Sequence, residues 1–216
     1  MATPGQLVQA IAEALGVPVE TVTNYDRVLS ESGMRSKSGR GRGAARVTAT
    51  DAANLLIAIL GSPIAGASVK EAANTCRTYG SLPVLGHVSG TLSFASARVG
   101  LRMLDELPKK HTLFDGISAL IQSATSGEHY RVPAKHWEFG CTITLDGPSP
   151  SAEIFAAGDI EGAKSTKFAR RVYGWKRGEK PEKPLPMERD LHQQRRITYR
   201  TIRRIGLLLS ESKSTQ

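Results

Sequence analysis

The chain has 216 residues, 40% of them hydrophobic and 23% charged, and a formal net charge of +9. This length suits one large domain or two small ones with a buried core. No apolar run approaches the roughly 20 residues that span a bilayer, and the uncharged, amphipathic N-terminus is unlike a signal peptide. The two cysteines, Cys76 and Cys141, lie far apart in different patterns, which disfavours a disulfide framework. We therefore expect a globular, cytoplasmic protein that does not enter membranes.

The positive charge is concentrated towards the C-terminus. Residues 1–163 contain 14 Lys/Arg and 15 Asp/Glu, whereas residues 164–216 contain 15 Lys/Arg and 5 Asp/Glu. Such an asymmetry favours an anionic polymer as the partner of the protein.

Two short helices are predicted at the N-terminus. Thr3-Pro4-Gly5-Gln6 is a capping-box pattern with proline at the first helical position, and apolar residues then recur at helical spacing over residues 4–15. Gly16-Val17-Pro18 ends this helix and starts the next, which covers residues 19–32 and ends at Gly33.

The second helix has the composition of a DNA recognition helix. Its apolar stripe is formed by Val19, Val22, Tyr25 and Leu29. Asparagine and arginine make bidentate contacts to adenine and guanine edges in the major groove, and threonine reaches phosphates or base edges. The DNA contacts predicted on this helix are Thr21, Thr23, Asn24, Tyr25 and Arg27.

Residues 34–48, MRSKSGRGRGAARVT, form a basic, glycine-rich segment between predicted helices. It carries five Lys/Arg and no acid, with glycines at 39, 41 and 43. A cationic segment in this position is typical of the wing of a winged helix-turn-helix, because flexible cations follow a phosphate backbone and release counterions. The alternative is a basic loop that only faces solvent. The predicted contacts are Arg35, Lys37, Arg40, Arg42 and Arg46.

The order of these elements resembles the N-terminal domain of MerR-type regulators over about residues 6–60. The matching positions are Gly16-Val17, Thr21-Val22, Asn24-Tyr25-Asp26-Arg27, Gly33-Met34, Arg46 and Thr48–Ile59. The resemblance implies a winged helix-turn-helix, a fold that excisionases share. The chain departs from the family pattern at Asn24, where arginine is usual, and its wing lacks the aromatic-Arg-x-Tyr element. No coiled coil or effector-binding cysteine cluster follows, so neither effector sensing nor coiled-coil dimerisation is carried over.

The middle of the chain reads as a mainly helical region. Thr48 to Asp51 caps a helix over residues 51–60, whose apolar face closes the N-terminal domain. A Ser68-Val69-Lys70-Glu71 capping box opens a helix to about Tyr79, residues 80–91 read as a loop, and residues 92–107 suggest a further helix. Thr112 precedes a helix over residues 113–124.

A β-hairpin is predicted next. Residues 137–145 alternate strictly between apolar and polar side chains, 146–150 form a turn, and 152–156 alternate again. A lone hairpin is marginal, so we expect it to pack on the helices or to join the sheet of a partner. Cys141 lies on the apolar face and is predicted to be a buried structural thiol.

Nothing in the sequence compels an enzyme. His129, His136 and Cys141 are conceivable metal ligands, but their spacing matches no strong zinc pattern. The 39–43 glycine-arginine repeat lacks the GK[ST] ending of a P-loop. We predict no catalytic residue, no metal and no cofactor.

The last quarter holds a basic arm and a helix. Residues 161–186 contain eight Lys/Arg interleaved with Phe168, Tyr173 and Trp175. Either these rings stack on bases while the cations bind phosphates, or they anchor the arm to its own domain. Residues 187–209 read as one basic amphipathic helix that contacts DNA or a partner subunit rather than a membrane. The contacts predicted in the arm are Lys164, Lys167, Arg170, Arg171, Lys176 and Arg177.

Together these patterns predict an α+β protein in three parts. Residues 1–61 form the winged helix-turn-helix, 62–160 a helical and β-hairpin domain for oligomerisation or ligand binding, and 161–216 the basic arm and helix. The predicted function is a homodimeric or higher-oligomeric, sequence-specific regulator of transcription on double-stranded DNA. In it the 19–32 helix enters the major groove and the wing contacts the backbone or minor groove. The alternative is a DNA-architectural or packaging protein of a mobile element, excisionase-like or small-terminase-like, and an enzyme acting on nucleic acid is a distant third. The target sequence, the direction of regulation and any effector are not encoded in recognisable motifs.

Overall fold

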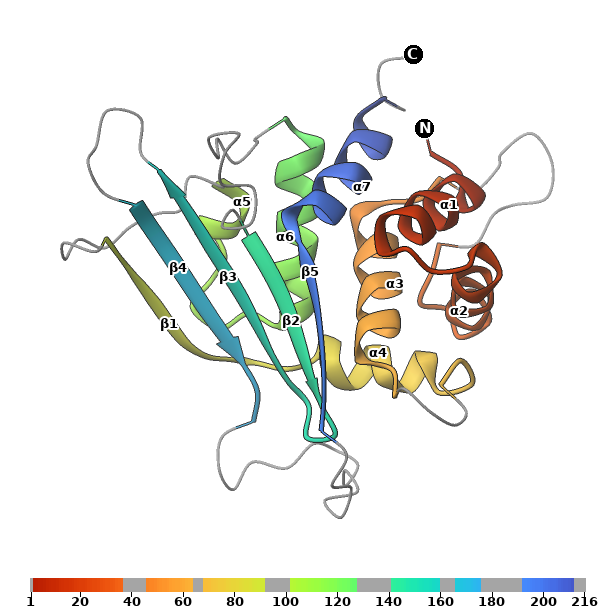
Figure 1. The fold of residues 1–216 in the computed structure, drawn as a ribbon, viewed down its shortest axis with the longest axis horizontal. Helices are drawn as coiled ribbons and strands as arrows, with labels where there is room; N and C mark the ends of the chain where they lie inside the picture. Colours follow the sequence, from red (N-terminus) through yellow and green to blue (C-terminus); the bar gives the residue numbers. More distant parts are fainter. Residues whose placement is uncertain are drawn as a thin grey trace.

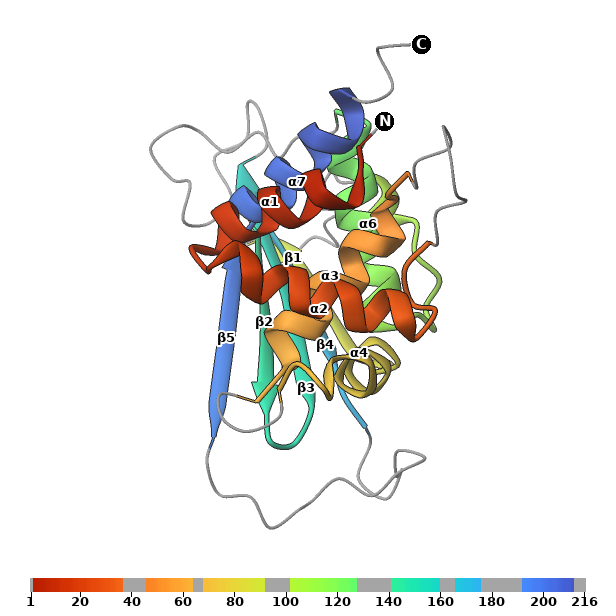
Figure 2. The same ribbon diagram turned by 90° about the vertical axis from the view of Figure 1, so that its right-hand side faces the viewer.

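A computed structural model of the chain describes residues 2–36, 46–63, 68–91, 102–127, 141–159, 166–175 and 192–211. In these ranges a five-stranded antiparallel sheet in the order β1-β4-β3-β2-β5 stands beside a layer of helices (Figures 1 and 2). This arrangement confirms a mixture of helices and an antiparallel sheet. No helix in the described ranges is both long and apolar enough to cross a membrane.

The first two helices form where the sequence predicts them. Helix α1 spans Pro4–Leu15 and α2 spans Val19–Glu31. The Thr3 hydroxyl accepts a hydrogen bond from the Gln6 backbone N–H, and the Gln6 side chain accepts one from the Thr3 N–H, which completes the capping box. Gly16 ends α1 with a φ of 66°, a left-handed conformation that glycine adopts without strain.

Helix α3, Ala49–Gly61, lies at the centre of the helical layer. Its capping box of Thr48 and Asp51 is present as expected. The prediction of a single apolar face is wrong, because every residue from Asp51 to Gly61 is buried. A helix that is buried on all sides suits this central position, where α2, α4, α6 and strands β2 and β5 contact it.

The remaining helices of the middle region differ in part from expectation. Helix α6, Leu113–Thr125, is confirmed together with its Thr112–Asp115 capping box. Helix α4 spans Ala72–Gly80 and starts after Glu71, whose side chain makes no cap, so the predicted Ser68–Glu71 box is wrong. Of the predicted 92–107 helix, only α5 at Arg102–Asp105 falls in the described residues.

The predicted hairpin forms the middle of the sheet. Strand β2, Cys141–Gly147, pairs with β3, Ser151–Asp159, so that Ile143 lies opposite Ile154. Residues 137–140 lie outside the described residues. Antiparallel pairing continues on both sides of the hairpin. These additional strands stabilise the hairpin, which would be only marginally stable alone.

Three strands come from segments that were predicted otherwise. Strand β1, Val84–Thr91, replaces the predicted 80–91 loop, and β4, Thr166–Tyr173, lies between β1 and β3 where a basic arm was expected. Strand β5, Gln193–Thr198, pairs with β2, and only then does α7, Tyr199–Glu211, begin; the prediction of one helix over 187–209 is therefore wrong. Strands β1 and β5 pair with strands far away in the sequence, and β4 pairs with its neighbour β3 but has an arginine-rich sequence, so local composition did not indicate a strand.

One hydrophobic core joins the helices to the sheet. Buried side chains of α1, α2 and α3 belong to the same cluster as Ile143, Ile154 and Tyr173 of the inner sheet face. Strand β5 also binds the end of α3, because the Arg195 guanidinium donates to the Ile59 carbonyl. The division into 1–61, 62–160 and 161–216 stays a prediction; in the described residues these parts share their core.

Candidate nucleic-acid interface

Helix α2 presents a polar face to solvent. Val22 and Leu29 are buried against the core, whereas Asn24 and Arg27 are exposed. Asn24 and Arg27 are three residues apart and therefore neighbours on one helical surface. Among the described residues, Arg27 has no acidic partner within ion-pair distance. These two side chains have the exposure that contacts to base edges require.

Other predicted contacts on α2 are placed differently. Tyr25 is 4% exposed and packs in the core, so its prediction as a DNA contact is wrong; it falls on the same stripe as Val22 and Leu29. Thr21 is half-buried. Thr23 is exposed, but its hydroxyl donates to the Val19 carbonyl one turn earlier, at 2.9 Å.

The chain leaves α2 along a fixed path. Gly33 takes a φ of 72°, and the Met34 N–H donates back to the Leu29 carbonyl at 2.9 Å. The Nε of Arg35 then lies 2.8 Å from the Oδ1 of Asp26 on α2, and the Arg35 side chain is 15% exposed. The contact is an ion pair without the alignment of a hydrogen bond. Arg35 is therefore occupied inside the protein and does not serve as a free cation.

Asp26 is a carboxylate in an unfavourable setting. Burial raises its pKa and the neighbouring Asp51 charge adds to that effect, while the Arg35 guanidinium opposes both. The Arg35 charge thus compensates a carboxylate that has lost much of its water. This pairing links the recognition-helix candidate α2 to the start of the basic segment.

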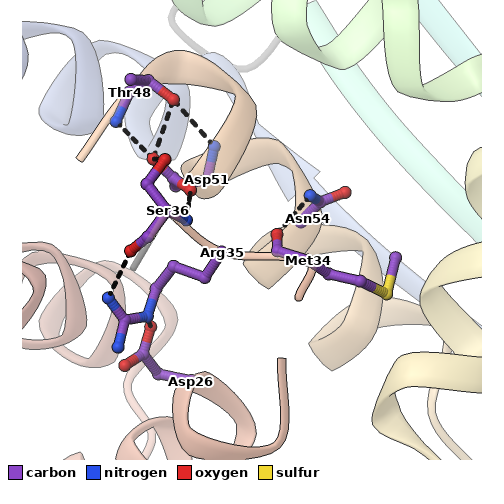
Figure 3. Close-up of polar contacts among 7 residues, drawn as sticks. All are labelled: Asp26, Met34, Arg35, Ser36, Thr48, Asp51 and Asn54. Atoms are coloured by element: carbon purple, nitrogen blue, oxygen red, sulfur yellow. Dashed lines mark hydrogen bonds and ion pairs between the residues drawn. The ribbon is translucent and has the colours of Figure 1, made fainter. Parts of the chain in front are cut away.

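Asp51 holds both ends of the basic segment (Figure 3). Its Oδ1 accepts a hydrogen bond from the Ser36 backbone N–H at 2.7 Å, and its Oδ2 accepts one from the Thr48 backbone N–H at 2.8 Å. The Ser36 and Thr48 hydroxyls also donate to Oδ2. One carboxylate therefore joins the residues on either side of 37–45.

A second tether lies beside Asp51. The Asn54 side-chain amide donates to the Met34 carbonyl at 2.7 Å (Figure 3). On the other side of the segment, the Val47 N–H donates to the Ala2 carbonyl at 3.0 Å. Arg46 is exposed and has no acidic partner within the described part of the chain. The predicted contacts Lys37, Arg40 and Arg42 lie outside the described residues.

The predicted contacts of the C-terminal arm do not form a free cationic surface. Arg171 is 5% exposed on the inner face of β4 and donates to the Leu104 carbonyl at 2.8 Å, so its prediction as a DNA contact is wrong. Arg170 points to the opposite face and pairs with Glu153 across the strands. Lys164, Lys176 and Arg177, together with the side chain of Lys167, lie outside the described residues.

The aromatic residues of the arm follow the anchoring alternative where they are described. Tyr173 is fully buried, and its hydroxyl lies 3.0 Å from the Nε2 of His111. Trp175 is partly buried against the core. The Tyr173 ring is therefore not available for stacking on bases.

Sequence reasoning missed Asp26, Asp51 and Asn54 as parts of this region. The Thr48-to-Asp51 spacing signalled a helix cap, and that signal was used only for the cap. The contact to Ser36 joins residues 15 positions apart, which no local pattern records.

The thiols show no sign of nucleophilic chemistry. Cys76 and Cys141 are buried, and burial raises the pKa of each to about 12. This burial confirms the interpretation of Cys141 as a buried thiol. In the ranges that the structure describes, no three His, Cys, Asp or Glu side chains are grouped as a metal site requires. His129 and His136 lie outside those ranges.

No family model, no curated protein and no solved structure matches this chain.

Proposed function

We propose that the chain is a sequence-specific DNA-binding regulator of transcription that inserts α2 into the major groove. The observation that carries this proposal is the exposed pair of Asn24 and Arg27 on an amphipathic helix, with the root of a basic segment fixed beside that helix by Asp26 and Arg35. The exposed pair reads base edges, and the cations of the basic segment bind phosphates.

The charges on α2 support the view that base recognition and phosphate binding belong to different segments. Glu20 and Glu31 near its two ends are exposed and acidic, so the helix alone is not a polycation. Sequence-independent affinity therefore comes from elsewhere, and the segment that contains Lys37, Arg40 and Arg42 is the neighbouring source of positive charge. The acidic ends oppose misplaced contacts with phosphates, which adds specificity.

The test compares two exposed arginines. DNA fragments are selected from a random pool by the purified full-length chain, and fluorescence anisotropy then measures affinity for the selected duplex. Arg27→Ala weakens binding about tenfold, the loss expected for one bidentate base contact. The control is Arg200→Ala on α7, which removes an exposed cation of equal charge. Equal effects of both substitutions, or equal affinity for selected and random duplexes, would refute the proposal.

The proposed active form is a homodimer that binds two half-sites about one helical turn apart. Light scattering of the purified chain measures the oligomer. A ring of eight or more subunits favours instead the packaging role in a mobile element.

A further inference from the structure

Two capping boxes that pair a threonine with an aspartate occur in the described residues, at the starts of α3 and α6, and their comparison singles out Asp51. In both boxes the aspartate Oδ2 accepts hydrogen bonds from the backbone N–H and the hydroxyl of the capping threonine, each at 2.8 Å. The pairs are Thr48 with Asp51 and Thr112 with Asp115. The return bond from the aspartate N–H to the threonine hydroxyl measures 3.3 Å in both.

The two boxes differ in what the rest of the carboxylate does. Within the described residues, Asp115 binds only its own capping threonine. Asp51 additionally accepts from the Ser36 N–H at 2.7 Å and from the Ser36 hydroxyl at 3.2 Å. Asp51 is 3% exposed, so water does not replace these bonds easily. A helix cap requires none of the contacts to Ser36.

The extra contacts join the two ends of a cationic stretch. Ser36 precedes and Thr48 follows residues 37–47, which contain Lys37, Arg40 and Arg42 and, two residues before Thr48, the exposed Arg46. Both ends meet at one carboxylate, while the Asp26–Arg35 ion pair fixes the Ser36 side to α2 (Figure 3). The geometry therefore sets where the stretch starts and ends relative to Asn24 and Arg27.

We infer that Asp51 is a positioning residue for DNA binding: it contacts no DNA, and by joining Ser36 to Thr48 it fixes the two ends of the basic segment, and with them the exposed Arg46, relative to α2. This inference rests on the proposed function. It assigns to one buried carboxylate the contact between the two ends of the segment.

Asparagine tests this role with almost no change in volume. The two backbone amides bind different oxygens, Ser36 at Oδ1 and Thr48 at Oδ2. An asparagine has only one acceptor oxygen, and its NH₂ group then faces an N–H donor. Asp51→Asn therefore breaks one of the two backbone hydrogen bonds whichever way its amide turns, and weakens the hold on that end of the segment.

The experiment measures the affinity of the full-length chain for the selected duplex over a range of salt concentrations. We expect Asp51→Asn to weaken binding about tenfold and to lower the slope of log K against log [salt] by about two phosphate contacts. The matched control is Asp115→Ala, which removes the equivalent cap of α6 and leaves affinity and slope unchanged. Loss of a cap alone does not change the salt slope, so equal behaviour of the two variants overturns the inference while the proposed function stands.

Two further measurements cover the remaining outcomes. Ser36→Ala removes one bond to Asp51 but keeps the capping box, so it weakens DNA binding about twofold even if Asp51→Asn fails to fold; an unchanged affinity contradicts the inference. Hydrogen exchange at the Ser36 amide without DNA becomes faster in Asp51→Asn and not in Asp115→Ala. If the wild-type chain does not prefer its selected duplex, the proposed function fails, and the exchange result alone then decides whether Asp51 anchors the segment.

Discussion

The arginines of the C-terminal quarter and those beside α2 differ in what they contact. Arg171 donates to the Leu104 carbonyl, Arg195 to the Ile59 carbonyl, and Arg204 pairs with Glu13 of α1. Arg170 and Arg196 bind acceptors on neighbouring strands. By contrast, Arg27 and Arg46 are exposed and without an acidic partner in the described residues.

This difference changes how the charge of the sequence is interpreted. The excess of positive charge lies in residues 164–216, which favoured that region as the site of an anionic partner. Five of its described arginines instead contact acceptors within the fold, whereas Arg200 is exposed. A cation that already contacts an acceptor within the fold is less available to a ligand. These contacts therefore indicate ligand binding better than the position of charge along the sequence does.

The largest expected effect comes from two adjacent arginines on opposite faces of β4. Arg171→Ala removes a buried guanidinium with its hydrogen bond and its packed aliphatic stem, and should lower the free energy of unfolding by about 3 kcal/mol. Arg170→Ala removes an exposed ion pair and should cost less than about 1 kcal/mol. Urea denaturation followed by circular dichroism measures the free energy of unfolding of both variants. Similar losses would contradict the distinction between arginines that stabilise the fold and arginines at its surface.

The close contact between α6 and α7 gives a second test of how the C-terminal quarter supports the fold. A Cβ on Gly206 would lie 2.4 Å from the Cβ of Ala124 and 2.7 Å from its backbone carbon. Gly206→Ala should therefore lower the free energy of unfolding by about 2 kcal/mol, although alanine favours helices. Gly5→Ala in α1, where a Cβ would meet nothing within 4 Å, is the control and should not destabilise the chain. An added Ala124→Gly substitution should recover part of the loss, and failure to do so would place the strain elsewhere.

The smallest expected effect is a loss of stability at low pH, which should leave the proposed DNA binding unchanged. Burial lowers the pKa of His111 below its ordinary 6.5. The unfolded chain therefore takes up a proton first as pH falls, so the stability contributed by neutral His111 is present above about pH 6.5 and is lost below it. Thermal unfolding should show the wild type losing more stability than His111→Gln between about pH 7.5 and about pH 5.5. Equal pH dependence of the two proteins would contradict this assignment.

DNA affinity should not follow this titration as long as the chain stays folded. Residues 1–61 contain no histidine, so the region around α2 has no side chain that ordinarily changes charge in this range. Anisotropy measurements at the same pH values provide the comparison.

The elements that the sequence predicted correctly carry their own local signals. Thr3, Thr48 and Thr112 each start a helix through a capping box, and strict alternation located the hairpin of β2 and β3. Strands β1, β4 and β5 lack such signals. Their segments are rich in glycine or arginine, and β1 and β5 pair with strands far away in the sequence.

The candidate site divides in the same way. The exposure of Asn24 and Arg27 follows from helical periodicity alone. The Arg35–Asp26 ion pair and the contact between Asp51 and Ser36 could not be predicted from periodicity. Both depend on how the chain returns to α2 and α3 after Gly33.

The contact between the first and the last helix has a consequence for synthesis in the cell. Helix α7 packs on α1, and β5 binds the end of α3. Both contacts require residues 193–211, which are synthesised last among the described residues. While the ribosome still holds those residues, α1 and α3 remain partly uncovered. The core therefore closes only once residues 193–211 have left the ribosome, and a stop codon before Gln193 would leave α1 and α3 without the contacts that α7 and β5 supply.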